Sequence, residues 1–220
     1  MTQSSPLLAA RGAARRFGQT PALEPVELEV WDGDALALVG PTGAGKSTLL
    51  SLLAGALGPS AGTIERRKGV RVGWAPQRPA QYGRLSARAN LELFARLEGE
   101  HDPPAAVDRL LAEFELPGGA EPSASLSAGS RQRLNLAISL LGSPGVLLLD
   151  EPTAALDPEQ RRRLWARVAE LRADGGAVVL AAQSLAEVGR VTDRIAALRA
   201  GRLVFAGPVL APVEARRLSA

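Results

Sequence analysis

The sequence predicts an α/β fold with a mostly parallel sheet, an N-terminal antiparallel β subdomain and an inserted helical subdomain. Three observations support this class. The apolar run 35–39 leads through a glycine-rich turn into a second apolar run, 49–54, which is typical of a helix. From residue 126 onward, strand-like and helical segments alternate, as they do in parallel sheets with right-handed crossovers. Residues 78–125 instead carry apolar side chains at helical spacing.

The N-terminal part, residues 6–31, has short apolar runs separated by turn residues. The runs at 7–10, 22–23 and 26–30 predict antiparallel strands that pack beside the central sheet. The dipeptide Phe17-Gly18 falls in the turn between them. Residues 62–65 and 70–74 predict two further short strands.

The glycine-rich turn after run 35–39 matches the pattern GxxxxGK(S/T) of a phosphate-binding loop. Its glycines let the backbone wrap closely, so that successive N–H groups and a helix N-terminus face phosphate oxygens. Lys46 can then reach the β- and γ-phosphates, and the Ser47 hydroxyl can coordinate Mg²⁺. A chance lysine in a glycine-rich turn is the alternative, but Lys46 is one of only two lysines in the chain. The predicted ATP-binding residues of this loop are Gly40, Pro41, Thr42, Gly43, Ala44, Gly45, Lys46, Ser47 and Thr48.

Phe17 is a candidate for contact with the adenine of the nucleotide. An exposed aromatic face suits a base, whereas an ordinary loop phenylalanine would be tucked into the core. The sequence leaves both interpretations open.

The pattern changes after Pro76-Gln77. Apolar residues at helical spacing around 91–95 and 107–114 predict two helices, divided by a linker at 100–104 and closed by Pro117-Gly118-Gly119. We therefore expect a single domain over 1–220, with a core formed by 1–77 and 126–220 and a helical subdomain at 78–125.

The remaining elements are predicted from residue 126 to the end. A helix is expected over 128–141 and another after Asp157, which is a suitable N-cap before Pro158. Strands are expected at 146–149, 177–181 and 194–198, with a hairpin partner at 201–205 and a short helix at the chain end.

The strand at 146–149 ends in two adjacent carboxylates. Beside a phosphate-binding loop, Asp150 can hold Mg²⁺, directly or through water, and Glu151 can orient or deprotonate an attacking water. A solvated acidic turn is the alternative. The loop earlier in the chain favours the roles in metal binding and catalysis.

Composition limits the other possibilities. A net charge of +3 with four Phe, three Trp and one Tyr gives little support for nucleic-acid binding. No apolar run approaches the roughly 20 residues that span a bilayer, and no signal-peptide pattern opens the chain. We therefore expect a cytoplasmic protein, with which the absence of cysteine agrees.

Further motifs reveal a resemblance. The stretch LSAGSRQRL at 126–134 resembles the LSGGQ-type signature of ATP-binding cassette (ABC) ATPases, Pro76-Gln77 resembles their Q-loop, and 154–157 resembles their D-loop. The resemblance covers residues 7–208 and implies a P-loop NTPase (RecA-like) core. Segments 82–91 and 156–162 are most similar to ATPase subunits of drug, lipid or polysaccharide exporters.

The resemblance implies a head-to-tail dimer of two ABC ATPase chains, identical or different, that closes around ATP and Mg²⁺. Ser127 and the Gly129 backbone would contact the γ-phosphate held by the partner chain, with Asp157 contributing from the D-loop. Gln77 would sense Mg²⁺ and the attacking water. A separate transmembrane permease subunit would hold the protein at the cytoplasmic face of the cell membrane. Ser127 and Asp157 can equally serve as helix N-caps.

Three positions depart from the family pattern. Ala128 replaces a signature glycine, which requires a negative φ there, and Ser130 replaces a glutamine. Gln183 stands where the family usually carries a switch histidine, and the only histidine, His101, lies in the polar linker. Glutamine can still donate a hydrogen bond but cannot become cationic. We expect slow hydrolysis, or else a functional replacement without kinetic cost.

The leading function is an ATPase subunit that drives a membrane exporter, with Glu151, Lys46, Gln77 and Gln183 as catalytic candidates and Ser47, Gln77 and Asp150 as metal candidates. One alternative is a soluble ABC ATPase that acts in assembly or DNA metabolism. Another is an ATP-gated clamp with little turnover.

Overall fold

The structure is a computed structural model that describes residues 5–183, 185–189 and 191–209. Among these residues, no helix is long and apolar enough to cross a membrane. In chain order the elements are β1 (Leu8–Phe17), β2 (Thr20–Val30), β3 (Ala35–Val39), α1 (Lys46–Leu53), β4 (Ala61–Arg66), β5 (Val72–Ala75), α2 (Ala87–Leu97), α3 (Pro103–Glu113), the 3₁₀ turn η1 (Ser123–Ser125), α4 (Ala128–Ser139), β6 (Val146–Asp150), α5 (Pro158–Ala173), β7 (Ala177–Ala182), α6 (Leu185–Val188), β8 (Arg194–Arg199) and β9 (Arg202–Pro208).

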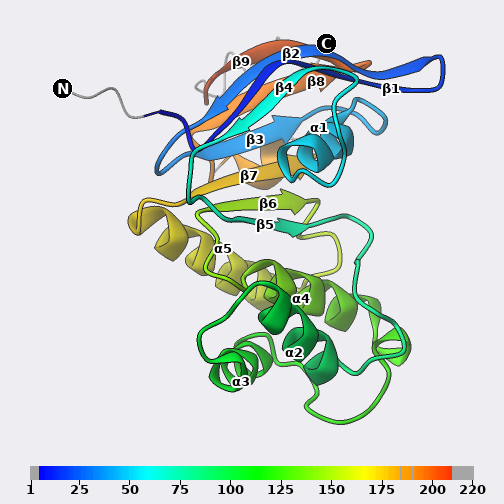
Figure 1. The fold of residues 1–220 in the computed structure, drawn as a ribbon, viewed down its shortest axis with the longest axis vertical. Helices are drawn as coiled ribbons and strands as arrows, with labels where there is room; N and C mark the ends of the chain where they lie inside the picture. Colours follow the sequence, from blue (N-terminus) through cyan, green and yellow to red (C-terminus); the bar gives the residue numbers. More distant parts are fainter. Residues whose placement is uncertain (1–4, 184, 190, 210–220) are drawn as a thin grey trace.

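The strands form two sheets. A six-stranded sheet has the order β5-β6-β7-β3-β8-β9, in which only β9 runs antiparallel to its neighbour. A three-stranded antiparallel sheet has the order β2-β1-β4. In Figure 1 this smaller sheet lies at the top, and helices α2, α3 and α4 lie at the opposite end of the molecule. The predicted α/β class with an antiparallel β part is confirmed.

Each central strand faces two hydrophobic cores, because successive side chains of a strand point to opposite sides of the sheet. On β3, Leu36 and Leu38 belong to the core shared with α1 and the antiparallel sheet, whereas Ala35 and Ala37 belong to the other. That second core also contains the apolar faces of α2, α3, α4 and α5. The six-stranded sheet is therefore covered on both faces, as mostly parallel sheets are.

The antiparallel part differs in detail from the sequence prediction. Three short runs were expected, but residues 8–30 form two long strands, β1 and β2, joined by the turn after Phe17. The pairing of β1 shifts register between Ala10 and Ala13 and again after Ala13, which interrupts the alternating apolar pattern in the sequence. The two strands expected over 62–74 belong to different sheets: β4 pairs with β1, and β5 pairs with β6.

Smaller differences concern the helices. The predicted helix 128–141 ends at Ser139, and α3 begins at Pro103, inside the expected linker, because Asp102 caps its N-terminus. The turn η1 and helix α6 were not predicted. The short helix expected at the chain end lies outside the described residues.

Candidate nucleotide and magnesium site

Four of the predicted segments meet at one edge of the six-stranded sheet. Strands β5, β6, β7 and β3 are parallel neighbours, so their carboxyl ends lie side by side. The segments that follow them carry, in this order across the sheet, Gln77, Glu151, Gln183 and Gly40. The carboxyl edge of a parallel sheet is where ligands bind in open α/β folds.

The loop after β3 can adopt its path only with glycine at key positions. Gly40 has φ +152°, and a Cβ atom there would lie 2.2 Å from the carbonyl oxygen of Leu198. Gly45 has φ +103° and is the N-cap of α1 without a side-chain hydrogen bond to the first turn. The first N–H groups of α1 thus have no side-chain cap, and groups of this kind bind anions at helix N-termini.

The ammonium group of Lys46 lies against its own loop. Its Nζ donates to the carbonyl oxygens of Gly40, at 2.6 Å, and Pro41, at 3.1 Å, and the residue is only 5% exposed. Lys46 thus places a positive charge at the loop. Its ammonium group can exchange the two carbonyl oxygens for phosphate oxygens when a nucleotide binds.

Asp150 at the end of β6 is a buried carboxylate, and one of its two oxygens is free to bind a metal ion. Burial raises the pKa of Asp150 above its ordinary value, and nearby Glu151 raises this pKa further, while the Ser47 hydroxyl and the charge of Lys46 lower it. Its Oδ1 has no hydrogen-bond partner among the described residues. An unpartnered buried carboxylate oxygen beside a hydroxyl fits Mg²⁺, which prefers oxygen ligands and is held in such sites by one or two protein groups together with substrate phosphates.

Two amide side chains hold the carboxylate of Glu151. Gln77 Nε2 donates to Glu151 Oε2 at 3.1 Å, and Gln183 Nε2 lies 3.3 Å from both carboxylate oxygens. Glu151 itself has φ +49°, an uncommon conformation for a residue with a side chain, and its backbone N–H donates to Ala181. The turn after β6 thus points Glu151 at the residues that follow the two flanking strands.

Helix α4 supports this arrangement through two buried amides that the sequence analysis did not single out. Asn135 Nδ2 donates to the carbonyl oxygen of Pro76 at 2.8 Å, and Gln132 Nε2 donates to that of Pro152 at 3.3 Å. Both side chains are buried. Their spacing of three residues places them on one helix face. The sequence carries no clear signal for this role, because α4 also contains Ser130, Arg131 and Arg133.

The signature and D-loop residues lie at helix N-termini. Ser127 caps α4, and Asp157 caps α5 in a capping box with Gln160. In the described part of the chain, no hydrogen bond joins Ser127 or Asp157 to loop 40–47. The two motifs do touch each other, because a Cβ atom on Gly129 would lie 3.0 Å from the carbonyl oxygen of Ala155. Ala128 begins α4 and is absent from the residues with positive φ, so alanine is accommodated there.

Phe17 lies at the tip of the β1–β2 hairpin with 52% of its surface exposed. The guanidinium carbon of Arg15 lies 4.9 Å from the ring centroid, in a cation–π contact. The ring is therefore presented to solvent rather than tucked into the core.

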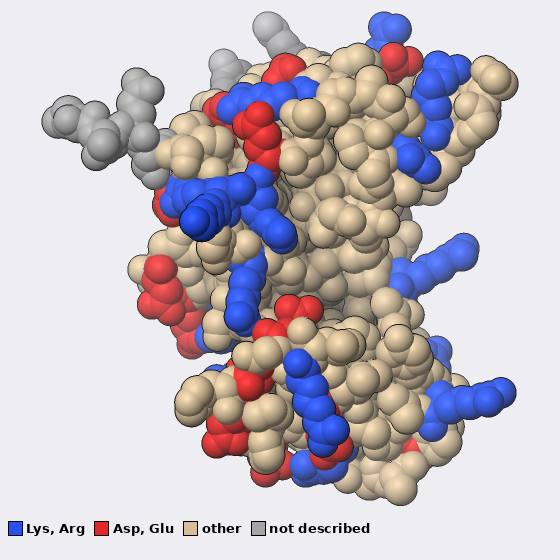
Figure 2. All heavy atoms as spheres, viewed as in Figure 1, with Lys and Arg blue, Asp and Glu red and all other residues tan. Residues whose placement is uncertain are grey.

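The charged surface is mixed. On the face shown in Figure 2, acidic side chains lie among the basic ones. Arg11 pairs with Glu29 and Arg67 pairs with Asp32, each at 2.6 Å. His101 is exposed between α2 and α3.

Comparison with known proteins agrees with this geometry. Residues 23–154 match a protein family described as ABC transporter. The chain is 39% identical over 209 residues to the daunorubicin resistance ATP-binding protein DrrA3 of Streptomyces coeruleorubidus, covering 89% of this chain and 66% of that protein. It is 34% identical over 220 residues to the Nod factor export ATP-binding protein I of Ralstonia nicotianae, covering 93% of this chain and 68% of that one.

A solved structure has the same fold. The ATP-binding cassette MJ0796, in a dimeric post-hydrolysis state bound to ADP and Pi, superimposes with a TM-score of 0.82 at 22% identity over 93% of this chain and 99% of that one. The chain described here spans about two thirds of the length of the two relatives named above.

Proposed function

The chain belongs to the ABC transporter family, and from this premise we propose that it binds ATP with Mg²⁺, hydrolyses it and thereby drives an exporter. The observation that carries the proposal is the cluster at the sheet edge, where Glu151 is held by Gln77 and Gln183 beside the loop of Lys46.

Each group in the cluster has a chemical task that its position supports. The N–H groups of loop 40–47 and the ammonium of Lys46 bind the phosphates of ATP. Ser47 and Asp150 would hold Mg²⁺, which would neutralise charge on the phosphate oxygens. Glu151 accepts a hydrogen bond from the attacking water and takes up its proton. Gln77 and Gln183 fix the direction of that carboxylate, because each donates an amide hydrogen to it.

A second chain completes the site in this proposal. Ser127, Gly129 and Asp157 belong to motifs that lie together on α4 and α5, without a hydrogen bond to loop 40–47 among the described residues. We infer that they meet the nucleotide held by a partner ABC ATPase chain. The dimeric state of the MJ0796 cassette supports this inference.

The membrane side of the proposal rests on the relatives. Two of them are named for daunorubicin resistance and Nod factor export. We infer that residues 78–125 form a helical subdomain that contacts a separate transmembrane permease, so that the protein is peripheral at the cytoplasmic face of the membrane. Export is the direction that the relatives' names favour.

The test compares the purified protein with Glu151→Gln. We expect Mg²⁺-dependent ATP hydrolysis in the parent and a loss of about 100-fold or more in the variant, because a general base contributes on that order. The variant should still dimerise when ATP is added. Hydrolysis that survives the substitution would contradict the role of Glu151. Affinity capture from detergent-solubilised membranes should recover a polytopic membrane protein, and recovery of soluble partners alone would contradict the transporter assignment.

A clamp with little turnover is the second candidate, and Gln183 is the observation that favours it. A neutral amide at this position holds Glu151 without the charge that a histidine could supply. ATP-driven dimers in the parent protein that persist without release of phosphate would identify the clamp.

A further inference from the structure

The first turn of α4 contains a series of three hydrogen bonds that links Ser127, Ser130 and Arg133. The backbone N–H of Ser130 donates to Ser127 Oγ at 3.1 Å, which is the helix cap. The two hydroxyl oxygens lie 3.0 Å apart, with Ser127 as the donor. Arg133 Nη2 then donates to Ser130 Oγ, also at 3.0 Å. Ser127 is exposed, whereas Ser130 and Arg133 are partly buried behind it.

The donors and acceptors of Ser127, Ser130 and Arg133 allow two arrangements of the two hydroxyl hydrogens. A hydroxyl carries one hydrogen, which can rotate, and two acceptor lone pairs, whereas a guanidinium can only donate. In the first arrangement Ser127 donates inward to Ser130. In the second, Ser130 donates to Ser127 and the Ser127 hydrogen points outward. The oxygens keep their positions in both, and Ser130 Oγ accepts from Arg133 throughout.

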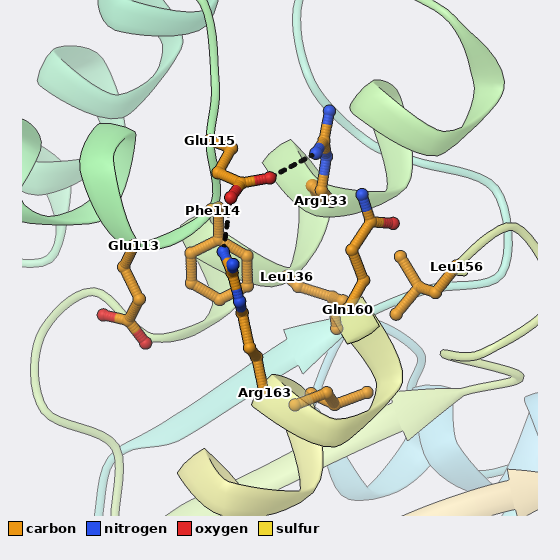
Figure 3. A pocket seen from close by; sticks show the side chains of 9 residues that line it. Glu113, Phe114, Glu115, Arg133, Leu136, Leu156, Gln160 and Arg163 are labelled. Carbon is orange, nitrogen blue, oxygen red and sulfur yellow. Dashed lines mark hydrogen bonds and ion pairs between the residues drawn. The ribbon is translucent and has the colours of Figure 1, made fainter. Parts of the chain in front are cut away.

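Arg133 lies between Ser130, to which it donates, and Glu115, with which it forms an ion pair. Its Nη1 lies 3.6 Å from a carboxylate oxygen of Glu115, and Glu115 also pairs with Arg163 of α5 at 2.6 Å. Figure 3 shows Glu115 between the two arginines, and all three residues line a small pocket together with Leu136 and Leu156. The Arg133 side chain is only 16% exposed. The guanidinium that fixes Ser130 is therefore confined by packing and by charge.

We propose that Ser130, fixed by Arg133, is a positioning residue that allows Ser127 to turn its hydroxyl hydrogen toward the γ-phosphate of a nucleotide held by a second chain. The proposal rests on the proposed function, in which Ser127 meets that nucleotide. When Ser127 donates outward, its oxygen accepts the Ser130 hydrogen, so the pair loses no internal hydrogen bond. This serine–arginine arrangement replaces the glutamine that the family signature carries at position 130.

The experiment uses the full chain with Glu151→Gln as the parent, because that protein should accumulate ATP-bound dimers. The ATP concentration that gives half-maximal dimerisation is measured by light scattering. For Ser130→Ala we expect this concentration to rise about threefold or more, because a hydroxyl that accepts a hydrogen bond donates more strongly, and Ser127 would meet the phosphate without that strengthening. The helix cap persists because the backbone N–H of residue 130 remains. Ser130→Thr, which keeps the hydroxyl, should return to within about twofold of the parent.

Two comparisons separate positioning from structure. Binding of a fluorescent ADP analogue to the monomer should be unchanged in Ser130→Ala, because loop 40–47 is intact. Arg133→Lys should raise the ATP concentration for dimerisation, and it decides the matter if Ser130→Ala does not fold. Glu113→Gln is the matched control, since Glu113 lines the same pocket and contacts Arg167 rather than Arg133.

The outcomes also distinguish a failure of the positioning role of Ser130 from a failure of the proposed function. If the Glu151→Gln protein does not dimerise with ATP, or if Ser127→Ala has no effect on dimerisation, the proposed function itself is contradicted. If Ser127→Ala weakens dimerisation while Ser130→Ala and Arg133→Lys match the parent, only the positioning role is overturned. Weakened dimerisation in Ser130→Ala with recovery in Ser130→Thr supports it.

Discussion

Gln183 donates its side-chain amide toward both carboxylate oxygens of Glu151, with the amide nitrogen 3.3 Å from each. The contact joins the residue that follows β7 to the residue that follows β6. Because a carboxamide does not titrate, Gln183 can donate to Glu151 but cannot gain a positive charge beside it. The position therefore controls orientation without adding charge.

Replacing this amide by a titratable ring should accelerate hydrolysis. A histidine beside Glu151 can carry a proton and make a charge-assisted hydrogen bond, which is about twice as strong as a neutral one. We expect Gln183→His to raise the turnover number of the ATP-driven dimer at least about threefold. Phosphate release by the purified proteins measures it, with Gln183→Ala as the control that should fall below the parent. Unchanged or lower turnover in the histidine variant would remove Gln183 as the limiting group.

Asp150 is expected to lower stability at neutral pH. Burial raises the pKa of Asp150 above its ordinary value of 3.8, so the folded chain holds this proton more tightly than the unfolded chain does. Stability from this group is therefore lost as the pH rises from the unfolded-state pKa through the raised one. Asp150→Asn should then be more stable than the parent by about 1 kcal/mol near neutral pH, while Mg²⁺-dependent hydrolysis is lost.

Urea unfolding of both proteins near pH 4 and pH 7.5 measures the difference, which should be larger at the higher pH. Asp174→Asn is the control, because Asp174 is exposed at the end of α5 and the substitution should change little. A parent that is more stable than Asp150→Asn at neutral pH would contradict the prediction.

Glycines in the phosphate-binding loop should differ sharply in their tolerance of alanine. A Cβ atom on Gly40 would lie 2.2 Å from the Leu198 carbonyl oxygen, so Gly40→Ala must displace backbone and should cost about 3 kcal/mol. Gly43 has φ +81° but nothing within 4 Å of a Cβ atom, so Gly43→Ala carries only the conformational cost of about 1–2 kcal/mol. Unfolding free energies without nucleotide test the order, and equal losses would contradict it.

Phe17 should matter for nucleotide affinity. Its ring is 52% exposed, and stacking of a base on an aromatic ring is worth about 1–3 kcal/mol. Phe17→Ala should weaken ATP binding about tenfold and leave binding of tripolyphosphate, which has no base, unchanged. Calorimetry measures both. Tyr82→Ala is the control, since Tyr82 is similarly exposed, at 55%, in the segment after the Q-loop. Equal loss of ATP and tripolyphosphate binding would argue against base contact.

The parts that sequence reasoning predicted are those with local signals. The loop at 40–47 has glycine, lysine and serine at a required spacing between a strand and a helix, and the structure shows that strand–loop–helix context. The two carboxylates follow an uninterrupted buried strand, and that strand is β6. The Asp157 cap was predicted because capping depends on neighbouring residues alone.

The parts that escaped prediction depend on distant partners. Nothing local to β4 or β5 shows that one pairs with β1 and the other with β6, because strand pairing is set by long-range contacts. The run 7–10 predicted only the first part of β1, because the register of this strand shifts after Ala10 and the alternating apolar pattern ends there. Asn135 and Gln132 resemble surface residues of a helix, and their roles emerge only when Pro76 and Pro152 are seen beside α4.

Because Lys46 is buried, the reactivity of its amine can report on the opening of the phosphate-binding loop. The sequence contains one other lysine, Lys68, which is exposed, whereas Lys46 is 5% exposed and held by two carbonyl oxygens. Labelling with an amine-reactive reagent, followed by peptide mass spectrometry, therefore measures the reactivity of two lysines. Lys68 serves as the internal standard, and Lys46 measures loop opening. Nucleotide protection can be followed at a single amine of the native chain, without any engineered probe.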